Sequence, residues 1–208
     1  MIIKAKNLHL GYNGKTVLEL PKLAVGENLL IAGKSGSGKT TLLHSLAGLL
    51  KPISGEIEIA GQNINKIPDN FRGQNIGIIF QTLHMINALS VIDNILVASF
   101  LADKKQDTAR AKELLKMLGI ENLAHKKPSE ISHGQAQRVA IARAAINNPK
   151  VIFGDEPTSA LDDDSCDKVI NLLKQVASST GAVLVVASHD ARLNKHFAKA
   201  LKLGGRNE

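Results

Sequence analysis

The stretch GKSGSGKT, residues 33–40, constrains the fold of this chain more than any other part of its sequence. It matches the phosphate-loop pattern G-x-x-x-x-G-K-[ST] at every fixed position. The apolar run ENLLIAG before it has the length of a short buried strand, and KTTLLHSLAGLL after it is typical of a helix. A glycine-rich turn that only caps a helix is the alternative. The order strand, loop, helix favours a phosphate-binding loop in an α/β protein.

The chemistry of such a loop gives each residue a task. The glycines let successive backbone N–H groups turn toward phosphate oxygens, and the following helix directs its positive end at the same place. Lys39 can reach the terminal phosphates, and the hydroxyl of Thr40 suits Mg²⁺. The residues that we expect to bind a nucleotide here are Gly33, Lys34, Ser35, Gly36, Ser37, Gly38, Lys39, Thr40 and Thr41.

An acidic pair ends a second apolar strand pattern, VIFGDEP (residues 151–157). Asp155 suits contact with Mg²⁺ through a water molecule, and Glu156 suits the base that acts on the attacking water. A solvated acidic pair at the end of a strand is the alternative. The phosphate loop in the same chain makes a metal ligand and a catalytic base the better interpretation.

Two further polar residues follow apolar strand patterns: His189 in VLVVASHD and Gln81 in IGIIFQ. Ligands of open α/β sheets bind at the carboxyl edge of the strands, so both side chains should face one site. An imidazole there can hydrogen-bond a γ-phosphate or the attacking water. The alternatives are that His189 is an ordinary surface histidine and that Gln81 is a polar residue that merely ends a strand.

Composition narrows the class of protein. The 208 residues carry a formal net charge of +7 that is spread along the chain, so we expect no nucleic-acid partner. One cysteine, Cys166, provides no disulfide framework. There is no signal-peptide pattern, and residues 76–102, the most apolar region, carry too many polar side chains to span a bilayer. A cytosolic protein is expected.

The remaining patterns outline the order of the elements. Alternation around the turn signal Asn13-Gly14 predicts an N-terminal pair of strands, and GEIEIAG predicts another strand. Helical segments near 91–101 and 108–118, the latter stopped by Gly119, indicate a helical insertion. A further helix is predicted from about Asp164 to Ala177.

In this order, the motifs resemble those of one family, the ATP-binding cassette (ABC) ATPases. GKSGSGKT is similar to its Walker A motif, GIIFQ to its Q-loop, ISHGQAQRVAIARA to its signature segment, VIFGDEP to its Walker B motif, SALD to its D-loop and SHD to its switch histidine. The resemblance runs from Tyr12 to Gly205. Six motifs in the right order are far more specific than any one of them.

The resemblance implies a fold. It is an α/β P-loop NTPase of the ABC type, with a RecA-like mixed-sheet core, an N-terminal antiparallel β subdomain and an inserted α-helical subdomain. The whole chain, residues 1–208, would be one ABC ATPase domain. Residues 1–80 and 147–208 would form the catalytic core with the β subdomain, and residues from about 82 to 146 the helical signature subdomain.

The resemblance also implies roles for single residues. Tyr12 resembles the aromatic residue that stacks on adenine, although an ordinary strand tyrosine is the alternative. Gln81 resembles the residue that touches Mg²⁺ and water and senses the transport partner, and Asp162 the residue that reaches across to a second subunit. The implied cofactors are ATP and Mg²⁺. The implied catalytic residues are Glu156, His189 and Gln81, and the implied metal ligands are Thr40, Gln81 and Asp155.

In this family two cassettes pack head to tail, each ATP lying between the Walker A motif of one and the signature segment of the other. The signature residues here are Ser132, His133, Gly134 and Gln135. The usual signature reads Leu-Ser-Gly-Gly-Gln, so this chain departs from it at Ile131 and His133. The spacing of Ser132 and Gln135 predicts a capping box, which puts His133 at a first helical position that does not require glycine. We expect a working but modified signature.

The implied function is that of the ATPase subunit of an ABC transporter, which hydrolyses ATP to ADP and phosphate. Its partners would be a second cassette, with a homodimer expected, and an integral membrane permease contacted through the helical subdomain and the Q-loop. The residues of the motifs and the compact C-terminus look most like those of the macrolide-exporter and lipoprotein-releasing branch of the family. The chain would lie in the cytoplasm, peripheral on the inner face of the plasma membrane. A soluble ATPase of the iron–sulfur cluster assembly type is the main alternative, and a degenerate cassette that binds ATP without cleaving it is another.

Overall fold

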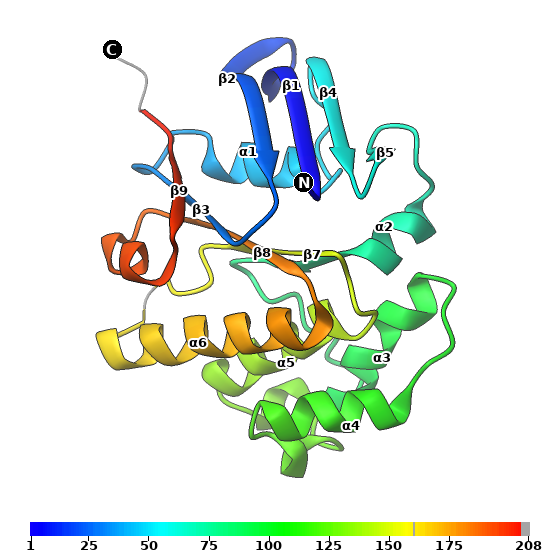
Figure 1. The fold of residues 1–208 in the computed structure, drawn as a ribbon. Helices are drawn as coiled ribbons and strands as arrows, with labels where there is room; N and C mark the ends of the chain where they lie inside the picture. The colour runs from blue at the N-terminus through cyan, green and yellow to red at the C-terminus, as the bar shows by residue number, and fades with distance from the viewer. Residues whose placement is uncertain (160, 205–208) are drawn as a thin grey trace.

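The computed structural model describes residues 1–159 and 161–204, which form two β-sheets and a group of helices (Figure 1). Ala160 of the SALD segment, and Gly205, where the resemblance ends, lie outside the described residues. The predicted fold class is confirmed. The antiparallel strands lie in the N-terminal sheet, and the described strands of the core sheet run parallel.

The N-terminal sheet has the strand order β2-β1-β4-β5. Its strands are β1 (Ile3–Tyr12), β2 (Lys15–Val25), β4 (Ser54–Ile59) and β5 (Gln62–Asn63). Asn13 and Gly14, with φ of 51° and 76°, form the two-residue turn between β1 and β2. Positive φ at both positions is what an Asn-Gly hairpin turn supplies, so the predicted strand pair is confirmed.

The core sheet has the order β6-β7-β8-β3-β9, and all its described pairings are parallel. Its strands are β3 (Leu29–Ala32), β6 (Ile76–Ile79), β7 (Val151–Asp155), β8 (Val183–Ser188) and β9 (Lys199–Lys202). Neighbouring residues such as Leu30 and Ile31 point into different hydrophobic clusters, one on each face of the sheet. Burial on both faces explains why these strands read as unbroken apolar runs.

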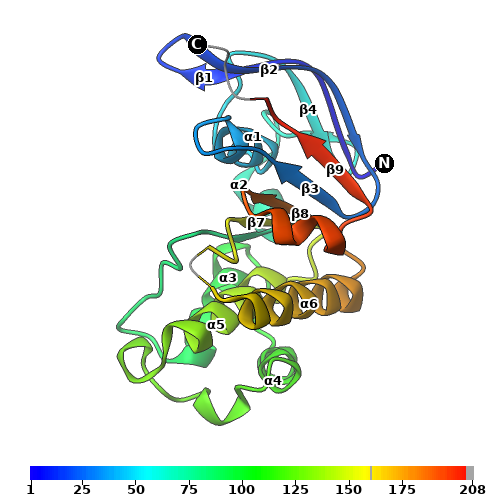
Figure 2. The ribbon, with the colours of Figure 1, turned by 90° about the vertical axis from the view of Figure 1, so that its left-hand side faces the viewer.

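Helices cover both faces of the core sheet. One face and the N-terminal sheet enclose α1 (Lys39–Leu46), and the other face carries α6 (Asp163–Thr180) and α5 (His133–Ala145) (Figures 1 and 2). Both views place α3 (Val91–Leu101) and α4 (Thr108–Met117) with α5 at the end of the molecule away from the N-terminal sheet. Short helical turns complete the chain: α2 (Asp69–Asn75), η1 (Glu121–Leu123), η2 (Pro128–Glu130) and η3 (Ala191–His196).

The structure corrects two predicted helix ends. The helix after the phosphate loop stops at Leu46 rather than Leu50, and Gly48 just beyond it takes a left-handed conformation with φ of 73°. The helix predicted from about Asp164 to Ala177 begins one residue earlier and continues to Thr180. Gly181, with φ of 68°, ends it in the manner typical of helix C-termini.

Several elements of the fold were not predicted from the sequence, among them β9 and α2. β9 reads KALK, two adjacent apolar residues between two lysines, which is too short a pattern to separate from a loop, and it lies at the edge of the sheet. α2 has no buried residue, so no apolar periodicity marks it. Within the described residues, no helix combines the length and the hydropathy needed to cross a membrane.

Candidate functional site

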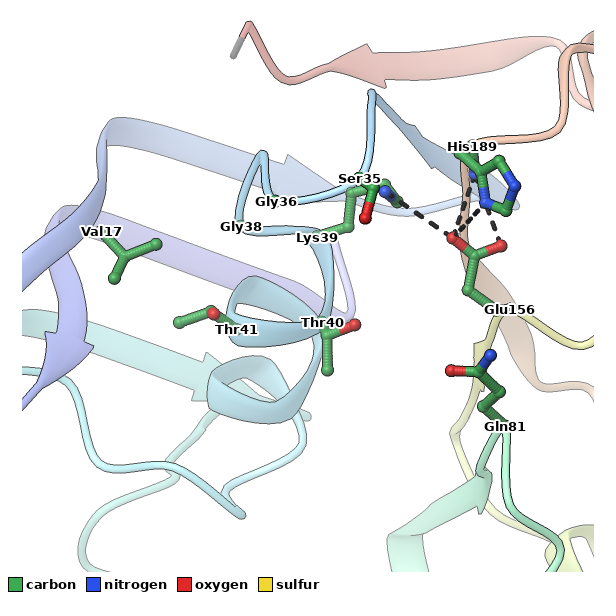
Figure 3. A pocket seen from close by; sticks show the side chains of 10 residues that line it. All are labelled: Val17, Ser35, Gly36, Gly38, Lys39, Thr40, Thr41, Gln81, Glu156 and His189. Carbon is green, nitrogen blue, oxygen red and sulfur yellow. Dashed lines mark hydrogen bonds and ion pairs between the residues drawn. The ribbon is translucent and has the colours of Figure 1, made fainter. Parts of the chain in front are cut away.

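A pocket of about 510 Å³ lies where β3, β6, β7 and β8 end (Figure 3). The structure thus brings the phosphate loop, Gln81, Glu156 and His189 to one place, although they are far apart in the sequence. The residues that line the pocket are Val17, Ser35, Gly36, Gly38, Lys39, Thr40, Thr41, Gln81, Glu156 and His189.

The loop between β3 and α1 curls because two of its glycines have positive φ. Gly36 has φ of 78°, and Gly38, the N-cap of α1, has φ of 89°. These angles are accessible to glycine and costly for other residues. The Ser37 N–H donates to the Lys34 carbonyl at 3.2 Å and closes the turn. The loop therefore presents backbone and the positive end of α1 to the pocket, which suits an anion.

Lys39 is the cation of the pocket wall, and only 6% of its side chain is exposed. Its Nζ donates to the Lys34 carbonyl at 3.0 Å and lies 3.6 Å from Glu156 Oε1. A lysine this buried needs partners for its charge, and the loop carbonyl and the carboxylate provide them. Both contacts are at the pocket, so anionic oxygens of a ligand can replace them.

Asp155 lies at the end of β7 and faces the first turn of α1. Thr40 Oγ1 donates to its Oδ1 at 3.0 Å, and His44 Nε2 lies 3.4 Å from its Oδ2. Burial raises the pKa of the Asp155 carboxyl above its usual range, and the Thr40 hydrogen bond and His44 oppose that shift. A buried carboxylate next to a hydroxyl is a set of oxygens that a divalent cation can use.

Glu156 has a strained backbone, with φ of 48°, a conformation that non-glycine residues rarely adopt. Its N–H continues the sheet to the Ala187 carbonyl at 2.9 Å. Its carboxylate accepts from the Ser188 hydroxyl at 2.9 Å and the His189 N–H at 3.1 Å, and lies 2.9 Å from His189 Nδ1 (Figure 3). Strain of this kind is retained where a side chain must be aimed, and here it aims a carboxylate into the pocket.

Gln81 and Val17 mark two ends of the pocket. In Figure 3, Gln81 lies beside Glu156, and its amide points across the pocket toward Thr40. Val17, from β2, lies at the opposite end, with the phosphate loop between. The polar residues are therefore gathered at one end, and an aliphatic side chain forms the wall of the other.

Three residues of this site were not predicted from the sequence. His44 follows Thr40 by four residues, so the helical repeat puts both on one face, and that spacing was an available signal. Ser188 directly precedes His189 and is the last residue of β8, so the sequence does not distinguish it from the rest of the strand. Val17 carries no chemical signal, because an aliphatic residue in a strand usually indicates core packing.

The comparison that decides the family covers most of the chain. A family model described as ABC transporter matches residues 21–159. The chain belongs to the ABC transporter family.

Solved ABC cassettes have the same fold. The ATP-binding cassette MJ0796, in a dimeric post-hydrolysis state bound to ADP and Pi, is 32% identical with a TM-score of 0.85, over 99% of this chain and 97% of that one. A second dimeric structure of MJ0796, described as a bacterial ABC transporter cassette, is 34% identical with a TM-score of 0.85, over 97% and 94%. An ATP-binding protein of an ABC transporter from Pyrococcus furiosus is 26% identical with a TM-score of 0.82, over 97% and 96%. With this family and fold, the chain is an ATPase.

Tyr12, expected from ABC ATPases to face adenine, ends β1 with 51% of its surface exposed. Its hydroxyl lies 3.4 Å from Thr41 Oγ1, which is in the pocket wall. Tyr12 itself is not among the residues that line the pocket. Its ring is therefore near the nucleotide site and largely exposed, and stacking on adenine stays a prediction.

The ABC signature segment begins α5 with the predicted capping box. Ser132 is the N-cap, its hydroxyl accepts from the Gln135 N–H at 3.3 Å, and the Gln135 Oε1 accepts from the Ser132 N–H at 2.8 Å. His133 is the first helical residue and is exposed. A Cβ added at Gly134 would meet nothing within 4 Å. The histidine thus leaves the helix start intact, and its effect on a second cassette depends on the space its ring takes.

Asp162, expected to reach a second subunit, is the N-cap of α6. Its carboxylate accepts from the Ser165 N–H at 2.8 Å and the Ser165 hydroxyl at 2.9 Å. Both hydrogen bonds lower the pKa of the Asp162 carboxyl, and the one from the Ser165 backbone N–H has the larger effect. Capping its own helix explains an aspartate here without a second subunit, so reaching across a dimer also stays a prediction.

Proposed function

We propose that this ATPase is the nucleotide-hydrolysing subunit of an ABC transporter and drives a separate membrane permease. The observation that carries the transport part is an apolar groove of about 390 Å³ next to the Q-loop. The hydrolytic part rests on the family and on the pocket described above. On this proposal residues 1–80 and 147–208 are the catalytic core, and residues from about 82 to 146 are the helical subdomain that meets the permease.

The pocket supports a division of work among its residues. Lys39 and the loop N–H groups hold the phosphates of ATP. Glu156 takes the proton of the attacking water, and His189, whose imidazole is 2.9 Å from that carboxylate, orients it and contacts the γ-phosphate. Gln81 orients the water from the other side of Glu156. A carboxylate flanked in this way matches the arrangement that hydrolysis of a phosphate anhydride needs.

The donor set also fits Mg²⁺. Thr40 Oγ1 and Asp155 Oδ1 are 3.0 Å apart, and the Gln81 amide points toward Thr40, so hard oxygen atoms converge on the phosphate end of the pocket. Bound there, Mg²⁺ would neutralise charge on the phosphate oxygens. Thr40 and Gln81 would be direct ligands, and Asp155 would hold the ion through water.

We further propose that two copies of the chain close head to tail on two ATP molecules. The MJ0796 cassette forms dimers, and one of its structures is bound to ADP and Pi. In the dimer, the helix start at Ser132 and Gly134 would face the ATP held by the Walker A motif of the other copy. His133 would lie beside that γ-phosphate. The rate of ATP hydrolysis per molecule of the isolated chain should therefore rise with its concentration.

The apolar groove lies between the end of β6, the start of the Q-loop, α3 and α5. Phe80 and His84, one residue before and three residues after Gln81, are in its wall. Two of the residues that line it are exposed apolar side chains, Leu101 at 70% and Ile86 at 41%. Large exposed apolar side chains around a groove are typical of a protein contact. A permease segment seated here would press on the residues that flank Gln81.

The residues of the segments QNIGIIFQ and INNPKVIFGDEPTSALD support a finer assignment, to the macrolide-exporter and lipoprotein-releasing branch of the family. In that setting the chain would be cytoplasmic and peripheral on the inner face of the plasma membrane. The permease would be its integral partner, and no nucleic acid would be involved.

Replacing Leu101, which lines the groove, by glutamate tests the transport part of the proposal. The tagged chain is purified from detergent-solubilised membranes of its own cells, and its partner is identified by mass spectrometry. We expect a protein with several membrane spans to co-purify with the unchanged chain and to be lost with Leu101→Glu, because a charge is placed in an apolar contact. The ATPase activity of the purified chain should change less than about twofold, since surface changes far from a site are nearly neutral.

The matched control is Lys112→Glu on α4, an exposed position outside the groove that also gains negative charge. It should keep the partner. A soluble partner in place of a membrane protein would contradict the proposal and favour the iron–sulfur assembly alternative. Retention of the permease by Leu101→Glu would remove the groove as its docking site.

Replacing Tyr12 by alanine tests adenine stacking. We expect affinity for ATP to fall by about two- to tenfold, the range of one aromatic stacking contact, and affinity for inorganic triphosphate to stay the same. Titration calorimetry measures both. Tyr12→Phe keeps the ring and removes the hydroxyl near Thr41, so it should bind ATP normally. Equal losses for ATP and triphosphate would assign Tyr12 to the fold of the loop instead.

A further inference from the structure

Arg192 joins two segments that are separate in the sequence, residues 161–163 and residues 188–190. It lies on η3, just after the switch histidine. Its Nη2 donates to the Leu161 carbonyl at 3.2 Å and to Asp190 Oδ2 at 2.6 Å, and its Nη1 donates to Asp163. Its Nε contacts both oxygens of Asp190 at 2.9 Å. One guanidinium therefore holds the start of α6 and the chain after β8 together.

Asp190 extends this connection toward the pocket. Its N–H donates to Ser188 Oγ at 3.1 Å, and the Ser188 hydroxyl donates to Glu156 Oε2 at 2.9 Å. His189, between them, holds the other carboxylate oxygen of Glu156 through its N–H and its ring. A continuous set of hydrogen bonds thus runs from residues 161–163, through Arg192 and Asp190, to the carboxylate in the pocket.

The contact between Arg192 and Asp190 is more typical of residues that fix each other's position than of a surface ion pair. The Asp190 side chain is 14% exposed and that of Arg192 35%. The hydrogen bond from Arg192 is the main reason that the pKa of the Asp190 carboxyl lies below its usual value. A planar guanidinium can donate to three oxygens in fixed directions, which a lysine ammonium on a flexible stem cannot reproduce.

We propose that Arg192 is a positioning residue for ATP hydrolysis. It couples the conformation of residues 161–163 to that of residues 188–190, and so to the orientation of the Glu156 carboxylate in the pocket. This inference rests on the proposed function, because the dimer would bring the second cassette to residues 161–163. Contact made there by one subunit would then set the carboxylate in the pocket of the other.

Hydrogen exchange of the nucleotide-free protein tests the connection itself, without any need for activity. In Arg192→Gln, backbone amides of residues 161–163 and 188–190 should exchange about tenfold faster, because charge-assisted hydrogen bonds that hold both segments are lost. Lys195→Gln is the matched control, since Lys195 lies on the same η3 and pairs with Asp167 at 2.7 Å, away from residues 161–163. It should leave both segments unchanged. Unchanged exchange at residues 161–163 in Arg192→Gln would overturn the proposal.

Steady-state kinetics tests the consequence. We expect Arg192→Gln to lower kcat by about tenfold, as small misplacements of catalytic groups do, and to change KM for ATP less than about twofold. Arg192→Lys should be as slow, because it keeps the charge and loses the fork. A normal kcat in Arg192→Gln, or full rescue by lysine, would overturn the positioning role. If the unchanged protein does not hydrolyse ATP, the proposed function fails, and hydrogen exchange still decides whether Arg192 ties the two segments.

Discussion

Replacing Glu156 by glutamine is expected to lower ATP turnover by about two to four orders of magnitude, the range that general acid–base catalysis contributes. Glutamine keeps the length and shape of the side chain and cannot accept the proton of the attacking water. Affinity for ATP should hold or rise slightly, because a negative charge is removed from beside the phosphate site. Phosphate release under saturating ATP measures the first effect, and equilibrium binding of a fluorescent ATP analogue the second.

The structure makes this substitution a test of chemistry and not of folding. The carboxylate accepts from the Ser188 hydroxyl and the His189 N–H, and an amide oxygen can take over one of these positions. The backbone at φ of 48° is as costly for glutamine as for glutamate, so the strain is unchanged. The variant should also accumulate as an ATP-bound dimer, because closure no longer leads to hydrolysis.

Glu56→Gln on the N-terminal sheet is the matched control, with the same chemical change at an exposed position. It should turn over ATP normally. A Glu156→Gln variant with turnover within a few-fold of the unchanged protein would remove Glu156 from the role of general base. The His189 imidazole would then be the first residue to test in its place.

Much of this site follows from the sequence because each of its polar groups ends an apolar strand. Parallel strands bring their carboxyl ends to one edge, so the order of residues alone is enough to expect the phosphate loop, Gln81, Glu156 and His189 together. The signature helix start was predictable for a different reason. Ser132 and Gln135 satisfy each other's backbone N–H groups locally, and local hydrogen bonds leave a fixed spacing in the sequence.

What the sequence leaves out depends on contacts between distant residues. Val17 lines the pocket because the hairpin of β1 and β2 folds over the phosphate loop, and nothing in its own surroundings in the sequence indicates that. Arg192 is an ordinary basic residue of a short turn until α6 brings Leu161 and Asp163 to it. The strained φ of Glu156 is likewise imposed by its neighbours. Residues whose roles depend on such contacts can be recognised only from the fold, whereas motifs can be recognised from the sequence alone.

Replacing Lys39 by alanine is expected to remove detectable ATP binding. A hydrogen bond to a charged group contributes about 1.5–3 kcal/mol, and Lys39 would make such bonds to the terminal phosphates, so affinity should fall by about a hundredfold or more. Its side chain is 6% exposed and 3.6 Å from Glu156, so alanine also leaves that carboxylate facing the phosphates without a cation between them. Repulsion between them adds to the loss. Titration calorimetry with ATP gives the affinity.

The loss should be specific to the phosphates and not to the fold. Lys39 Nζ holds the Lys34 carbonyl, so the loop loses one hydrogen bond, and the melting temperature should fall by only a few degrees. Lys51→Ala, an exposed position beyond α1 with the same change of charge, should bind ATP as the unchanged chain does. ATP affinity preserved in Lys39→Ala would contradict the phosphate-loop assignment, because that assignment requires Lys39 to contact the terminal phosphates.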